Sequence, residues 1–232
     1  MVLPFLVYYI FVYSSNETFF TTLDYVGPRE VIETSEGFDT NFYKIPHWEF
    51  TDQDGNVLTS EDMEGKIYIS SFFFCSCPTI CPTMNFHLSS VFDRFEGREK
   101  FYIVSHTVDP ERDSVSVLKA YAKERGYDHP QWRFVTGPKD SIYAVAENYF
   151  LNAMEDQLAP GGFLHSESVV LVDWNGNIRS RKDDNGNIKA LYNVLEAVEI
   201  NELKEDIKVL IAEQYKEEAR EAKRIEDAKK GK

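Results

Sequence analysis

Alternating strands and helices are predicted by the hydrophobic pattern between positions 45 and 212. The run IYISSFFF at residues 67–74 is β-branched and aromatic, as expected for a central strand buried on both faces. Further along, strand-like runs alternate with segments whose apolar residues recur three and four positions apart, which is the helical spacing. The expected strands are 101–108 and 132–137. One expected helix ends near residue 95, and two others span 114–126 and 140–150. This alternation predicts an α/β fold with parallel crossovers covered by helices.

Two antiparallel hairpins are indicated by turn residues between short apolar runs. Asp54-Gly55 and Asn175-Gly176 are both typical hairpin turns, and the second lies inside the late run SVVLVDWNGNIRSR. Ser60 precedes acidic residues and is the expected cap of a short helical turn. The predicted sheet is therefore mixed, with parallel central strands and an antiparallel end.

The N-terminal part, residues 1–44, predicts an anchor or signal followed by a linker. Residues 2–13 are apolar, which is shorter than the roughly 20 residues that a membrane-spanning helix needs. The first basic residue is Arg29, so the basic start of a secretory signal is absent. Residues 14–44 are polar and predict an irregular linker. The alternative is a short apolar terminus that packs on the domain.

The C-terminal part is helical in composition from residue 188 onward. Beyond residue 215 the sequence is almost entirely charged residues and Ala, so residues 213–232 predict a solvated helical tail, or one that binds a partner. We expect residues 45–212 to form a single domain. Its last helix has a core-facing stripe of Ile200, Leu203, Ile207, Leu210 and Ile211.

The overall charge excludes one class of partner. The 232 residues carry a formal net charge of −14. Binding to nucleic acid needs clustered Lys and Arg to neutralise phosphates, and here such residues gather only in the C-terminal tail. We therefore expect no nucleic-acid partner.

The positions of the cysteines indicate the chemistry of the protein. The 3 cysteines of the chain fall within the segment CSCPTIC, which follows the expected central strand. Such a cluster indicates a metal or redox site better than a disulfide framework. Pro78 and Pro82 disfavour helix at the residues before them, which predicts Cys77 at the strand end and Cys81 at the helix entrance. A thiol at a helix N-terminus has a lowered pKa, and the resulting thiolate can bind metal.

The Cys-x-x-x-Cys spacing is one residue wider than the pair of a thioredoxin-type oxidoreductase, so the loop can open around an ion. Two soft thiolates favour monovalent copper, with zinc as the competitor, and either metal needs a further ligand. His165 is the strongest candidate, because it lies in a Gly-rich loop just before an expected strand.

The other candidate residues have plainer interpretations. His87 is expected on a helix surface or in packing, and His106 within a strand. Cys75 either joins the metal site, exchanges disulfides with Cys77, or is a buried strand thiol. The remaining histidines, His47 and His129, adjoin prolines in expected loops.

Over residues 45–212 the chain resembles the Sco/SenC family of copper-handling proteins. The resemblance is carried by three segments in order: CPTICP after an aromatic strand, HTVDPERDS at residues 106–114, and the late FLHSESVVLVDWNGNIR. It implies a thioredoxin-like fold, an N-terminal membrane anchor, and one copper held by Cys77, Cys81 and His165. Asp109 in the VDPERD segment is expected to support the site loop or to have a structural role there.

The resemblance also implies a task, which is delivering copper to, or preparing, the binuclear copper centre of cytochrome c oxidase during assembly. The implied partners are the copper-site subunit of that oxidase or another copper protein, a thiol-disulfide reductant, and the membrane. The implied location is the inner membrane with the domain in the periplasm. Two features depart from the family pattern: Leu164 stands where many members have an acidic residue, and Cys75 is additional.

Two functions compete for the same three residues. A metallochaperone needs reduced Cys77 and Cys81 and passes copper by ligand exchange, without being a turnover enzyme. A thiol-disulfide oxidoreductase cycles the same pair between dithiol and disulfide. A peroxidase of the thioredoxin fold is a third class, but the sequence shows no polar residues arranged to activate a peroxide-reactive cysteine.

Overall fold

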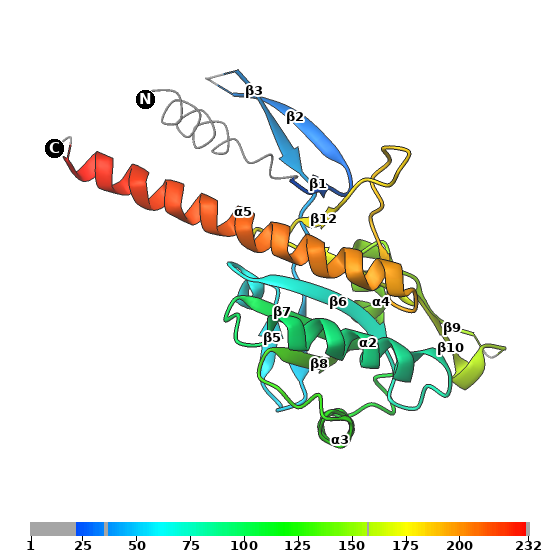
Figure 1. The fold of residues 1–232 in the computed structure, drawn as a ribbon. Helices are drawn as coiled ribbons and strands as arrows, with labels where there is room; N and C mark the ends of the chain where they lie inside the picture. The colour runs from blue at the N-terminus through cyan, green and yellow to red at the C-terminus, as the bar shows by residue number, and fades with distance from the viewer. Residues whose placement is uncertain (1–21, 35–36, 157, 231–232) are drawn as a thin grey trace, which may run out of the picture.

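A mixed β-sheet forms the centre of the molecule (Figure 1). The computed structural model describes residues 22–34, 37–156 and 158–230. Within these ranges the main sheet has the strand order β1-β12-β11-β6-β7-β8-β4-β5, and β13 also pairs with β11. β6, β7 and β8 are parallel neighbours, as predicted, and the other pairs are antiparallel. The strands are β1 (Asp24–Tyr25), β4 (Glu49–Asp52), β5 (Val57–Thr59), β6 (Ile67–Phe73), β7 (Phe101–Thr107), β8 (Trp132–Thr136), β11 (Ser168–Val172), β12 (Ile178–Ser180) and β13 (Tyr192–Asn193).

The central strand β6 is buried along its whole length, which explains its unbroken apolar sequence. Its side chains alternate between two covered faces. Phe73 contacts Tyr121 of α3 on one face, and Phe72 contacts Tyr149, which follows α4, on the other. Asn85 of α2 donates to the Tyr121 hydroxyl at 2.9 Å, so α2 lies on the same face as α3. The helices are α2 (Ile80–Phe95), α3 (Val115–Arg125), α4 (Lys139–Asn148) and α5 (Ala197–Lys230).

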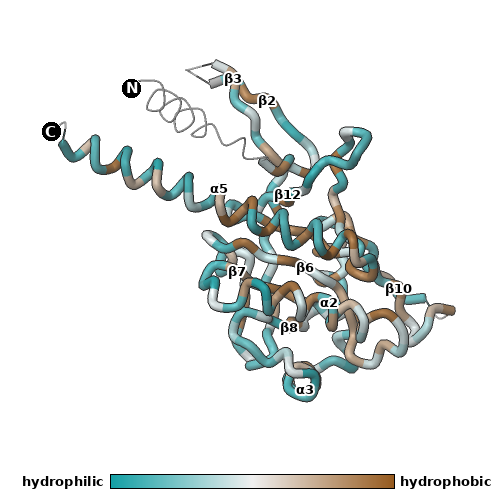
Figure 2. Tube along the Cα trace, in the orientation of Figure 1, coloured by the Kyte–Doolittle hydropathy of each residue, from teal (hydrophilic) through white to brown (hydrophobic). Residues whose placement is uncertain are grey.

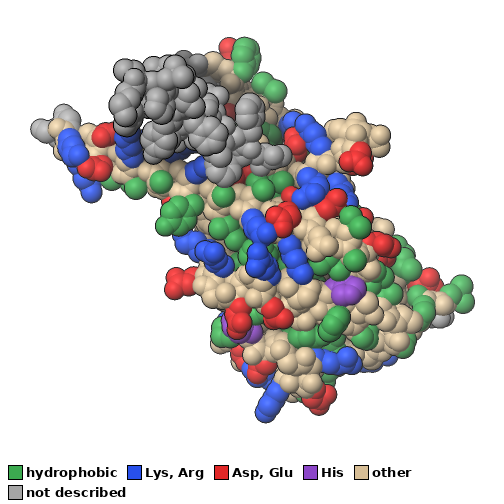
Figure 3. All heavy atoms as spheres, in the orientation of Figure 1, with side chains coloured by type: hydrophobic (Ala, Val, Ile, Leu, Met, Phe, Trp, Pro, Cys, Tyr) green, Lys and Arg blue, Asp and Glu red, His purple; other side chains and the backbone are tan. Residues whose placement is uncertain are grey.

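The long helix α5 packs with its first half and projects with its second (Figure 1). The predicted core-facing stripe is buried at its first four positions, and Ile211 is half-buried. From residue 215 to 230 every residue is exposed, and Figures 2 and 3 show this part as hydrophilic with both charge signs. The predicted helix from residue 188 is wrong, because 188–196 contain turns and β13. Pairing with β11 outweighs the local helical composition there.

Strands replace the predicted irregular linker in the described residues before 45. β1 pairs with β12 at the edge of the main sheet, and the neighbouring Leu23 and Val26 are buried. β2 (Arg29–Thr34) and β3 (Gly37–Phe42) form a separate hairpin. β1 was not predicted because its partner, β12, lies far along the chain. The apolar run 2–13 lies outside the described residues, and the domain boundaries at 45 and 213 stay predictions.

None of the helices in the described ranges is long and apolar enough to span a bilayer. α5 is long, but its second half is charged and exposed.

Both predicted hairpins are present, β4 with β5 and β11 with β12. The helical turn that follows the first one, Glu61–Met63, is capped differently from the prediction. The Ser60 side chain makes no capping hydrogen bond. Instead the Thr59 N–H donates to the Asp62 carboxylate at 2.9 Å, and the Asp62 N–H donates to the Thr59 hydroxyl at 3.3 Å. This reciprocal pair is a capping box shifted by one residue.

Candidate metal centre

The loop between β6 and α2 carries both cysteines of the Cys-x-x-x-Cys pair. β6 ends at Phe73, and the Cys77 N–H donates to the Phe74 carbonyl at 3.2 Å, which closes a tight turn. α2 begins at Ile80, so Cys81 lies in its first turn, as predicted. Cys77 lies in the loop beyond the strand end and precedes the helix. Both thiols therefore sit where a buried strand passes into a helix.

His165 is presented by a second, smaller sheet. It is the last residue of β10 (Phe163–His165), which pairs with β9 (Ala153–Glu155). The sequence predicted a loop here, and that is wrong. Strands of three residues separated by the turn Pro160–Gly162 give no readable alternation, so this hairpin has no sequence signal of its own.

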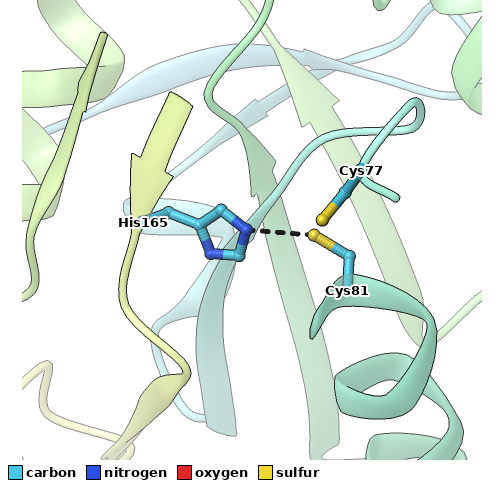
Figure 4. Close-up of side chains that lie close together, drawn as sticks. All are labelled: Cys77, Cys81 and His165. Atoms are coloured by element: carbon cyan, nitrogen blue, oxygen red, sulfur yellow. Dashed lines mark hydrogen bonds between the residues drawn. The ribbon is translucent and has the colours of Figure 1, made fainter. Parts of the chain in front are cut away.

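The three predicted site residues lie together (Figure 4). Cys81 Sγ lies 3.0 Å from His165 Nε2, and the two sulfurs and one imidazole nitrogen lie within 4.8 Å of one another. Two donors that each lie about 2.3 Å from one ion cannot be more than about 4.6 Å apart, so little movement is needed to close the three on an ion. All three side chains are buried. Within the described part of the chain, no other cluster of three or more His, Cys or acidic residues could hold a metal.

The hydrogen bonds of His165 fix which nitrogen faces the thiols. Nδ1 lies 3.1 Å from the Ser166 carbonyl, which can only accept, so Nδ1 carries the proton. Nε2 is therefore the nitrogen that faces Cys81. The Ser166 N–H donates to the Asn152 carbonyl at 3.0 Å, and the edge of the imidazole meets the Phe74 ring at a centroid distance of 5.7 Å. Metal-binding histidines are commonly oriented by a carbonyl in this way.

The two thiols have opposite acidities. A hydrogen bond from the Cys81 thiol, together with backbone N–H groups of Cys81 and Thr79, holds the pKa of Cys77 well below its ordinary value. The same hydrogen bond, and then burial, raise the pKa of Cys81. Cys77 is the thiolate and Cys81 the proton donor. The sequence assigned the benefit of the helix N-terminus to Cys81, but the backbone N–H groups of Thr79 and Cys81 also stabilise the thiolate of Cys77, which lies in the loop before the helix.

Cys75 lies outside this cluster. The strand ends before it, so the argument that it shares a face with Cys77 does not hold. Its backbone N–H donates to Asp113 Oδ2 at 3.0 Å. Burial and the Asp113 carboxylate raise the pKa of its thiol, which stays protonated at neutral pH. It is half-buried in a turn, and so it is not a buried strand thiol either.

The remaining histidines have structural surroundings. His106 is fully buried and stacks on Phe72 at a centroid distance of 4.9 Å, as expected for a strand residue. His87 Nδ1 lies 2.6 Å from the Val194 carbonyl and ties α2 to the segment before α5. His47 contacts Glu61, and His129 Nδ1 accepts the N–H of Gln131.

Comparison with known proteins shows the family of the chain. The model of the SCO1/SenC family matches residues 39–199, more than half of the chain. The chain belongs to the SCO1/SenC family. A SCO1 protein homolog of Bacillus subtilis (strain 168) is 30% identical to this Sco protein over 146 residues, which cover 62% of this chain and 75% of the relative.

Two solved Sco structures share the fold. BsSco, a member of the Sco family of cytochrome c oxidase assembly proteins in which a disulfide switch was identified, is 25% identical with a TM-score of 0.61, covering 72% of this chain and 93% of that one. Yeast Sco1 with copper bound is 25% identical with a TM-score of 0.54, covering 70% of this chain and 87% of that one. The predicted α/β, thioredoxin-like architecture of this Sco protein is confirmed.

The donor set of this Sco protein suits a soft cation. Thiolate and imidazole ligands select monovalent copper or zinc over hard cations such as magnesium or calcium, which need oxygen ligands. The cluster offers two sulfurs and one nitrogen, and both thiols are free of disulfides.

Proposed function

We propose that this protein is a copper metallochaperone in which Cys77, Cys81 and His165 bind one copper ion. The observation that carries the proposal is the convergence of a thiolate, a thiol and an imidazole nitrogen in one buried cluster. Copper is a cargo in this account. The copper-bound yeast Sco1 supports the choice of metal. The relation of BsSco to oxidase assembly supports cytochrome c oxidase as the client, with delivery to, or preparation of, its binuclear copper centre.

The acidities of the Cys77 and Cys81 thiols determine how copper is bound. Cys77 is already a thiolate, so it is the first ligand that an incoming ion meets. Cys81 has to lose its proton when it binds, and each copper bound therefore releases a proton. Three ligands on two separate segments of the chain can be replaced one at a time, which suits transfer to an acceptor by ligand exchange.

A second function is favoured by the closeness of the two sulfurs within the cluster. The pair can act as a thiol-disulfide oxidoreductase on the cysteines of a copper-site client. In that reaction the Cys77 thiolate and the Cys81 thiol lose two electrons and one proton and form a disulfide, while a client disulfide gains the two electrons, takes up that proton and one from solvent, and becomes two thiols. A thiol-disulfide reductant then restores the pair. This function needs neither His165 nor copper.

We further propose that the domain is held at the inner membrane and faces the periplasm. The apolar run at residues 2–13 supports a membrane-associated N-terminal segment. The copper-site subunit of the oxidase is the proposed partner at that surface.

The test is a copper titration of the reduced full chain in competition with a Cu(I) chelator. The expected stoichiometry is one copper per chain, and His165→Ala is expected to weaken binding by at least about 100-fold, because it removes a ligand. His47→Ala is the matched control, since that imidazole is exposed and lies outside the cluster. The copper-loaded protein should then transfer its ion to a reduced apo copper-site subunit.

Two results would contradict the chaperone. One is no copper retention by the wild type together with reversible reduction of a client disulfide, which assigns the pair to thiol-disulfide exchange. The other is equal copper binding by wild type and His165→Ala, which removes the imidazole from the site.

A further inference from the structure

One connecting segment contacts both parts of the chain that carry the proposed metal ligands. The segment between β7 and α3, residues 108–114, contains the VDPERD motif. Toward the cysteines, Asp113 Oδ2 accepts the N–H of Cys75 at 3.0 Å and the hydroxyl of Thr107 at 2.5 Å. Asp113 is 1% exposed, so this carboxylate anchors the start of the cysteine loop from inside the protein.

The same segment reaches the histidine side through Arg112. Its Nε donates to the buried carboxylate of Asp109, and its Nη2 donates to the Gly161 carbonyl at 3.3 Å. The guanidinium carbon lies 5.4 Å from the centre of the Phe163 ring, close enough for a cation–π contact. Gly161 and Phe163 lie just before His165 in the chain.

The ring contact continues from Phe163 to the ligands. The Phe163 and Phe74 rings pack at a centroid distance of 5.3 Å, and Phe74 meets the edge of the His165 ring at 5.7 Å. Phe74 is also the residue whose carbonyl closes the turn at Cys77. The packed rings therefore join the turn of the cysteine loop to the imidazole.

We infer that Arg112, held in place by Asp109, is a positioning residue that fixes His165 against the Cys77–Cys81 pair. The inference rests on the proposed copper function and extends it beyond the three ligands. Among the described residues β10 pairs only with the three-residue strand β9, and it follows two glycines with positive φ, so the hairpin has little rigidity of its own. Arg112 supplies an attachment to the main domain.

This role differs from that of an ordinary ion pair. The Arg112 side chain is 58% exposed but that of Asp109 is 4% exposed, so replacing Arg112 leaves a buried carboxylate without its partner and costs some stability. Denaturant unfolding of Arg112→Met separates that loss from a specific loosening of the hairpin. Arg224 forms an i,i+3 pair with Glu221 on the exposed part of α5, far along the helix from the domain, and is the control for removal of a surface arginine.

The experiment is a double-mutant cycle in the full chain with Cu(I) affinity as readout. Arg112→Met should weaken binding by about 10–100-fold, the range typical for loss of a group that orients a metal ligand. Arg224→Met should have no effect. In the His165→Ala background, Arg112→Met should change affinity by less than about twofold, because its target is gone.

A second readout needs no metal. In the reduced apoprotein, Arg112→Met should accelerate hydrogen exchange of residues 158–166 at least about threefold, with no comparable change in α2. Unchanged affinity and unchanged exchange would overturn the inference. So would an equal loss of affinity in the His165→Ala background. If the wild type itself bound no copper, the proposed function would fail, whereas the exchange experiment would still decide whether Arg112 holds the hairpin.

Discussion

Cys81 Sγ and His165 Nε2 lie 3.0 Å apart, although they are 84 residues apart in the chain, with Cys81 in α2 and His165 in β10. Nδ1 of the imidazole donates to the Ser166 carbonyl, and Nε2 is the nitrogen that faces the thiols. That contact leaves Nε2 directed at the position that a metal shared with Cys77 would occupy. Its integrity depends on how the short β9–β10 hairpin is held.

Substitution of Gly161 tests whether the contact between Cys81 and His165 depends on how the β9–β10 hairpin is held. Gly161 has φ of +82°, and a Cβ there would lie 2.7 Å from the Phe74 ring. Gly161→Ala should therefore push the hairpin away from Phe74 and weaken Cu(I) affinity by about 10-fold or more. Gly162 also has a positive φ, of +89°, but a Cβ there meets nothing within 4 Å.

The control variant is accordingly Gly162→Ala, which carries the backbone strain, about 1 kcal/mol of stability, without the collision. Chemical denaturation and chelator competition measure the two effects separately. Equal copper affinities for the two alanine variants would show that the ring contact is unimportant.

The acidity of Cys77 gives a prediction for the reduced apoprotein. Its folded pKa lies below the unfolded value of about 9, so below pH 9 the unfolded chain binds more protons. Stability should then fall as the pH falls below 9. Cys81 has the opposite sign, because its folded pKa is raised, and stability should also fall above pH 9.

Cys77→Ser should reduce the dependence of stability on pH below pH 9 and remove the thiolate absorbance near 240 nm at neutral pH. Urea unfolding and ultraviolet titration in the presence of a chelator measure these two quantities. A thiolate that persists in Cys77→Ser but disappears in Cys81→Ser would reverse the assignment.

His106 should dominate the acid response of the core. Burial lowers its pKa from 6.5 to about 4, so between these values the unfolded state binds the extra proton and stability falls with falling pH. At about 1.4 kcal/mol per pKa unit the loss is on the order of 3 kcal/mol. Nε2 of His106 has no hydrogen-bond partner among the described residues.

His106→Phe should therefore fold, keep its copper affinity and lose this pH dependence between 6.5 and 4. Denaturation at a series of pH values provides the measurement, with wild type as reference. A copper affinity that fell with this substitution would instead connect His106 to the site.

The ligand residues could be predicted because their chemistry is local or their motifs are ordered. Cys77 and Cys81 lie in one loop whose prolines set its conformation, and the family resemblance supplied His165. The supporting residues were harder to find. Arg112 and Asp113 stand inside the VDPERD segment, yet nothing in the sequence indicates that one binds the Gly161 carbonyl and the other the Cys75 N–H.

The misplaced elements share a physical cause. β1 pairs with β12, which lies far along the chain, and β9 pairs with the nearby β10, in each case through strands of two or three residues. Strands this short carry no periodic pattern of their own. The thiolate was assigned to the wrong cysteine for a related reason, since the direction of the backbone N–H groups at the helix entrance depends on the conformation of the loop.

X-ray absorption at the copper edge of the Cu(I)-loaded protein identifies the ligands themselves. A site formed by Cys77, Cys81 and His165 should show two sulfur ligands and one imidazole nitrogen, unchanged in Cys75→Ala, with the nitrogen lost in His165→Ala. A site with three sulfur ligands that loses one in Cys75→Ala, or one that keeps its nitrogen in His165→Ala, would contradict that assignment.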